Sequence, residues 1–172
     1  AEAVEELVRR RILRHFGERL DFVHDRIREV VYQESGPERQ RALHARVTGA
    51  IESVYTESLD DHVERLAHHA VRGGLHDTAV VALRRAGSKA FSNSAHGEAL
   101  HDFTQALQLL VHIQRVEDRD REELALRLAL GPTLQVARGH AAPGVEENYR
   151  RASELAARTG TAVQRFQSLW GL

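Results

Sequence analysis

The chain has 172 residues, of which 28% are charged and 5% are aromatic, a balance that suits helices with narrow apolar stripes. Its formal net charge of -1 gives no broad field to attract nucleic acid or an anionic membrane, so a partner must be recognised locally. The absence of cysteine excludes disulfides and thiolate metal sites and agrees with a reducing cytoplasm. No apolar run approaches the roughly 18 residues that span a bilayer, so we expect a cytoplasmic protein without a membrane segment.

The first part of the chain, residues 1–58, is expected to form a small winged-helix-like module. Apolar residues recur at helical spacing from Ala1 to Phe16, and Gly17 supplies a stop. Residues 20–24 alternate between apolar and polar and predict at most one short strand. Asp25 can then cap the next helix through its carboxylate. A helix, one short strand and two further helices are the order on which this prediction depends.

The second part, residues 59–172, is expected to consist of helical hairpins, with the last hairpin cut short at the end of the chain. Apolar positions recur at helical spacing between breakers such as Gly73-Gly74 and the segment 139–144. The polar run 115–123 is either a loop or the exposed start of the next helix. These features predict an all-α fold.

One segment, residues 83–106, has the spacing of a helix–turn–helix repeat. Small residues at Gly87 and Ala99 would let two antiparallel helices approach closely. Phe103 would fill the gap one turn later, and Ala106 would seat the next repeat. The order of small, small, large and small residues resembles a tetratricopeptide (TPR) repeat.

The same offsets recur elsewhere in the chain. Gly131, Tyr149 and Ala152 have the same spacing of small, large and small residues if the glycine–proline loop holds two extra residues. A further match to this spacing begins at Leu66-Ala67. Two of the three sets overlap on the segment 75–91, which can be the second helix of one pair or the first of the next. The spacing predicts antiparallel hairpins in a TPR-like right-handed superhelix, and an irregular helical bundle is the alternative.

A wider resemblance rests on five motifs in a fixed order. They are DFVHDRIREVVYQ, ERQRALHARV, ERLAHHAVRGG, LRRAGSKAFSNSAHGEAL and LALGPTLQVARGHAAPGVEENYRRASEL. Together they resemble the winged-helix and TPR region of bacterial STAND-type predicted ATPases, in which a P-loop ATPase domain comes first. A class III adenylate or guanylate cyclase, or a DNA-binding regulator, is often fused to such proteins. The resemblance implies a non-catalytic coupling and sensor segment that regulates an upstream nucleotide-binding domain; the alternative is a stand-alone TPR adaptor.

The resemblance also implies a nucleotide contact. In such ATPases a histidine–aspartate pair at the start of a winged-helix helix can face the bound nucleotide, and His24 and Asp25 match that pair. His24 would donate to a phosphate of ADP, while Asp25 would cap the helix and fix the imidazole. The plainer interpretation is a cap beside a packed or exposed histidine. No cofactor is expected in this chain, and ATP or ADP belongs to the longer parent protein.

A partner is expected on the concave face of the helical array. There Arg84, Ser88 and Phe91 would line an inner groove, continued by Leu128 and Gln135 in the next repeat. Such a surface suits a protein or peptide partner, or the ATPase domain of the same chain, but not nucleic acid or a membrane. The sequence leaves the oligomeric state open.

Catalysis by this chain is not expected. It has no GxxxxGK[ST] phosphate-binding loop and no metal and nucleotide apparatus of a cyclase. Eleven histidines raise the further hypothesis of a metal-dependent hydrolase. However, His68 and His69 are neighbours expected to point to different parts of a helix surface, and His96 and His101 are five residues apart rather than four. The sequence therefore predicts no catalytic residue and no metal site.

Overall fold

The computed structural model describes residues 2–17, 19–140 and 142–171. In these ranges it contains nine α-helices and two short strands, so the predicted all-α class is confirmed. The contacts divide the chain into two units, residues 1–43 and residues 44–172. The domain boundary expected after residue 58 stays a prediction, because a division by contacts does not show which part folds alone. No helix in the described ranges is both long and apolar enough to cross a membrane.

Unit 1–43 is built around a short β-hairpin. Its elements are α1 (Glu2–Arg9), β1 (Leu13–Phe16), β2 (Arg19–Phe22), α2 (Asp25–Glu34) and the start of α3 (Pro37–Val54).

The sequence predicted a helix up to Phe16 followed by at most one strand, and this prediction is wrong. The helix ends at Arg9, and two strands follow it. The two strands pair antiparallel, with Leu13 opposite Phe22. Gly17 follows β1 with a φ of 59°, a left-handed conformation that glycine adopts without steric cost. It therefore lies at a turn between strands and does not end a helix. Apolar residues a helical turn apart also occur in such short strands, so periodicity alone could not distinguish the two structures.

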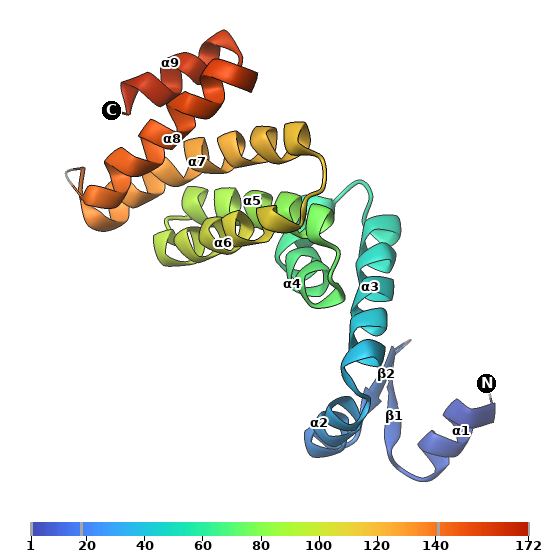
Figure 1. The fold of residues 1–172 in the computed structure, drawn as a ribbon. Helices are drawn as coiled ribbons and strands as arrows, with labels where there is room; N and C mark the ends of the chain where they lie inside the picture. Colours follow the sequence, from blue (N-terminus) through green and yellow to red (C-terminus); the bar gives the residue numbers. More distant parts are fainter. Residues whose placement is uncertain (1, 18, 141, 172) are drawn as a thin grey trace. The chain divides into compact units, whose positions relative to one another are not determined.

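In unit 44–172, each α-helix from α4 onward packs against the next (Figure 1). After the rest of α3 its elements are η1 (Leu59–His62), α4 (Val63–Gly73), α5 (His76–Ser92), α6 (His96–Leu109), η2 (Leu110–His112), α7 (Val116–Arg138), α8 (Pro143–Thr159) and α9 (Ala162–Trp170). The polar run 115–123 thus begins α7 and is not a loop. Gly74 ends α4 in the left-handed conformation, with a φ of 69°, so that α5 can begin two residues later.

The core of this unit runs through successive helices. Large side chains alternate with alanines, which keeps neighbouring helices close. Its buried members include Val63, Leu66, Ala67, Val80, Leu83, Ala86, Ala99, Phe103, Ala106, Leu126 and Tyr149. A smaller cluster joins α7 to α8 and consists of Leu124, Ala152, Leu155 and Ala156.

Glycines set the closest helix contacts. A Cβ added to Gly87 on α5 would lie 2.8 Å from a ring carbon of Phe103 on α6. In the same way, a Cβ at Gly131 on α7 would overlap the ring of Tyr149 on α8. On α4, a Cβ at Gly73 would lie 2.9 Å from the backbone nitrogen of Ala45 on α3. Each helix pair therefore depends on a missing side chain.

The Gly87–Phe103 contact gives the first testable prediction. The Phe103 ring is only 1% exposed, so it can make room for a Cβ only by shifting among buried neighbours, and Gly87→Ala should lower the free energy of unfolding by about 1–3 kcal/mol. Urea unfolding followed by circular dichroism measures this change. Gly49→Ala is the control, because no atom lies within 4 Å of a Cβ at that α3 position. It should stabilise the protein by about 0.5–1 kcal/mol. An unchanged or increased stability of Gly87→Ala would contradict the packing described here.

Candidate functional site

A groove of about 590 Å³ lies along α4, α5 and α6, and we call it the α4–α6 groove. Its floor is apolar and consists of Ala67, Leu83 and Ala86, which are all buried. Its charged and titratable lining residues are Glu64, His68, Arg72, Glu98, His101 and Asp102. An apolar floor with a few polar side chains above it is typical of a binding surface.

Helical periodicity explains how these side chains come together. On α4, Glu64, His68 and Arg72 follow one another at intervals of one turn and so share a face. On α6, Glu98 and Asp102 have the same spacing. The groove thus forms between two polar helix faces, and Leu83 and Ala86 of α5 with Ala67 of α4 supply the floor between them.

The acidic groups of the groove differ in their partners. Burial is the largest single influence on Glu64 and opposes its ionisation. Its hydrogen bond with Lys89, at 2.9 Å, a backbone hydrogen bond and the charges of Lys89 and His62 together outweigh burial and hold the pKa of Glu64 below its usual value. Asp102 behaves in the opposite way. Burial raises its pKa, the carboxylates of Glu98 and Glu64 raise it further, and His101 only partly opposes them. Within the described ranges, neither Glu98 nor Asp102 forms an ion pair.

This arrangement predicts a pH-dependent effect of Asp102→Asn. The folded-state pKa of Asp102 lies above the ordinary 3.8, so its charged form costs stability at neutral pH. The variant should therefore be more stable than the wild type at neutral pH. The gain should shrink as the pH falls through the raised pKa and vanish below about 3.8, where the wild-type carboxyl is neutral both folded and unfolded.

Urea unfolding at several pH values measures this difference. The exposed α3 residue Glu52 provides the control variant Glu52→Gln, which should show no such gain. If Asp102→Asn is no more stable than the wild type at neutral pH, or if its gain in stability does not change with pH, the raised pKa of Asp102 would be contradicted.

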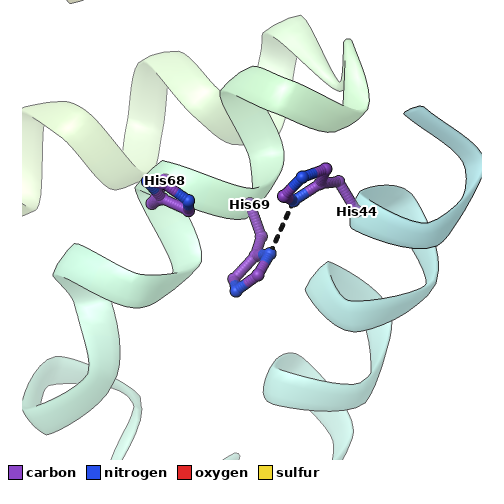
Figure 2. A group of neighbouring side chains, drawn as sticks. All are labelled: His44, His68 and His69. Atoms are coloured by element: carbon purple, nitrogen blue, oxygen red, sulfur yellow. Dashed lines mark hydrogen bonds between the residues drawn. The ribbon is translucent and has the colours of Figure 1, made fainter. Parts of the chain in front are cut away.

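A second group of side chains, the histidine cluster, consists of His44 on α3 and His68 and His69 on α4. Figure 2 shows a nitrogen of the His44 ring and one of the His69 ring directed toward each other. These two Nδ1 atoms lie 2.8 Å apart. His44 is buried, His69 is partly buried and His68 is exposed. The missing side chain of Gly73 lets α4 approach α3 closely enough to bring the rings together.

Burial and neighbouring charges favour the neutral form of two of these histidines. Burial lowers the pKa of His44 from the usual 6.5, and the charges of Arg72 and His68 lower it further. Burial likewise lowers the pKa of His69, and the charges of His44 and His68 lower it further. In the neutral pair one Nδ1 donates its proton and the other accepts it, so the two rings must be opposite tautomers.

Sequence reasoning missed the histidine cluster. It treated His68 and His69 as diverging neighbours and left out His44, which reaches them from a different helix. The only signal was the presence of histidines in the adjacent motifs ERQRALHARV and ERLAHHAVRGG. Spacing rules for metal ligands within a helix do not detect a pair of helices that share a site.

In unit 1–43 the structure changes the role expected for Asp25. His24 is the N-cap of α2 and makes no capping hydrogen bond with its side chain. Asp25 is the first helical residue, and its carboxylate lies 3.3 Å from Arg28. The predicted side-chain cap by Asp25 is therefore wrong. Both residues are exposed, and the nucleotide contact stays a prediction.

The residues expected to line a groove on α5 do not line the α4–α6 groove. Arg84 points to α7, where its Nε donates to Glu122 at 3.1 Å. Ser88 donates to the backbone oxygen of Arg84, and the Phe91 ring lies near that of His96. The side of α5 that faces the groove is the one with Leu83 and Ala86.

The two expected groove residues on α7 also lie elsewhere. Leu128 lines a mainly apolar pocket together with Tyr149, Phe166 and Trp170. Gln135 is partly buried and contributes to neither this pocket nor the α4–α6 groove. The structure therefore does not bring the five expected residues together in one site.

The fold and these sites define the chain as an all-α protein of serially packed helices with a polar groove and a histidine cluster. No known family model and no solved structure matches it. "Uncharacterized protein R02095" of Rhizobium meliloti (strain 1021) is 29% identical over 152 residues, which cover 87% of this chain. The matched part makes up 15% of that relative, so the chain spans only a small share of the relative's length.

Proposed function

We propose that this chain is a non-catalytic, TPR-like coupling and sensor segment of a larger bacterial signalling ATPase. In this proposal, the α4–α6 groove binds a protein or peptide partner and thereby regulates an upstream nucleotide-binding domain. The groove carries the proposal, because it combines an apolar floor with two acidic groups, Glu98 and Asp102, that have no ion pair within the described ranges.

The packing supports a TPR-like array. The small residues Gly87 and Ala99 are buried where α5 meets α6, and Phe103 fills the space beside Gly87. Gly131 and Tyr149 make an equivalent contact between α7 and α8. The other expected packing residues, Ala106 and Ala152, are fully buried. In unit 1–43, the β-hairpin with its neighbouring helices supports a winged-helix-like module.

The longer relative supports a role within a larger protein. Since the match covers only 15% of that protein, such a chain can occur beside further domains. The resemblance to STAND-type ATPases assigns nucleotide binding and hydrolysis to a domain outside this chain, with His24 donating to a phosphate of ADP. An unchanged ADP affinity of the His24→Ala variant in the longer protein would exclude that contact. A stand-alone TPR adaptor is the alternative, since the groove alone suits either function.

The charge of the groove indicates the chemistry of its partner. Asp102 pays a desolvation cost that a cationic side chain would offset, because opposite charge within a few ångströms favours the ionised carboxylate. A lysine or arginine side chain has an apolar stem for the floor and a charged end for Glu98 and Asp102. A basic segment of a protein partner therefore suits the groove best.

Binding of a fluorescein-labelled arginine-rich peptide, followed by anisotropy, tests this function. The double variant Glu98→Gln/Asp102→Asn should weaken binding about three- to tenfold, because two partly exposed charge pairs are lost. The matched control is Glu52→Gln/Glu57→Gln, which removes the same charge from exposed positions outside the groove. Equal weakening by both double variants, or no binding to the wild type, would contradict groove binding.

A further inference from the structure

We propose that His44, His68 and His69 form a binding site for a divalent transition-metal ion, with Zn²⁺ as the best match. Each imidazole can offer one ring nitrogen, and these three nitrogens lie within 4.8 Å of one another. Imidazole nitrogen is a preferred ligand of Zn²⁺, and three protein ligands leave a fourth position for water or another ligand. The proposal does not depend on the function proposed for the groove, although His68 also lines the groove.

The distances suit a metal after small side-chain movements. Zinc–nitrogen bonds of about 2.0–2.1 Å in a tetrahedral site place ligand nitrogens about 3.3–3.4 Å apart. The His44–His69 distance of 2.8 Å is shorter than this value, and the 4.8 Å limit for the whole set is longer. Two movements are needed to reach the tetrahedral range: the His44 and His69 nitrogens must move apart by about 0.5 Å, and the exposed His68 ring must turn toward them.

The tautomers of the His44–His69 pair also suit a metal. A hydrogen bond at the Nδ1–Nδ1 distance of 2.8 Å requires one proton between the two nitrogens. If the donating ring moves its proton from Nδ1 to Nε2, both Nδ1 lone pairs can bind the metal. Two neutral rings therefore bind the ion without a net loss of protons, and the hydrogen bond between them is replaced by two metal–nitrogen bonds.

The surroundings give the site rigidity on one side and access on the other. His44 is only 9% exposed on α3, whereas His68 is exposed on α4, so an ion can enter from solvent. Arg65 and Arg72 place positive charge near the cluster and oppose a cation. We therefore expect an affinity in the micromolar range rather than that of a closed structural zinc site. The bound ion would link α3 to α4.

Calorimetric titration of the untagged, chelator-treated 172-residue chain with Zn²⁺ tests the site. The wild type should bind one ion per chain with micromolar affinity. His68→Gln should weaken binding at least tenfold, and since this side chain is exposed, its replacement should not disturb folding. His69→Gln should have a similar effect.

The control is His140→Gln, which removes an exposed histidine outside the cluster and should leave Zn²⁺ affinity unchanged. Titration with Co²⁺ gives an independent readout, because a tetrahedral nitrogen site absorbs visible light more strongly than hexaaqua Co²⁺. Failure of the wild type to bind Zn²⁺, or equal binding by the wild type, His68→Gln and His69→Gln, would overturn the proposal. Either result would leave the binding of a basic peptide in the groove unaffected.

Discussion

The close approach of neighbouring helices at glycine is the constraint on which unit 44–172 depends. Gly87 lets the Phe103 ring lie against the backbone of α5, and this contact fixes the spacing of α5 and α6. The α4–α6 groove exists because α6 lies at that distance with Glu98 and Asp102 on its open face. In the same way, the missing side chain of Gly73 lets α4 approach α3, and this close contact brings the histidines of the cluster together. Packing thus decides where both candidate sites lie.

Helix α4 connects the two sites. Glu64, His68 and Arg72 line the groove, whereas His68 and His69 contribute to the histidine cluster, so His68 belongs to both. Lys89 of α5 holds the start of α4 through Glu64. The proposed basic partner in the groove and the proposed metal at the histidine cluster would both act on this helix. Each would then change the affinity for the other if the position or tautomer of His68 differs between the bound states.

Sequence reasoning reached the helical class but not the sites, for physical reasons. Helical periodicity is local, so it revealed the helices and the small residue at Gly87 together with its large counterpart Phe103. The β-hairpin escaped because Gly17 ends either a helix or a strand. The groove was expected on the Arg84 side of α5, since the repeat frame did not determine which side faces α4 and α6. His44 was missed because contacts between helices leave no spacing signal.

The mass of the native polypeptide tests the central claim, a coupling segment within a larger ATPase, most directly. An antibody against this chain would detect it in the source cells by immunoblot, and mass spectrometry would map the peptides of the band. The account predicts a species several times larger than 19.3 kDa that contains peptides of a phosphate-binding loop. A species of about 19.3 kDa would contradict the account and leave the stand-alone adaptor.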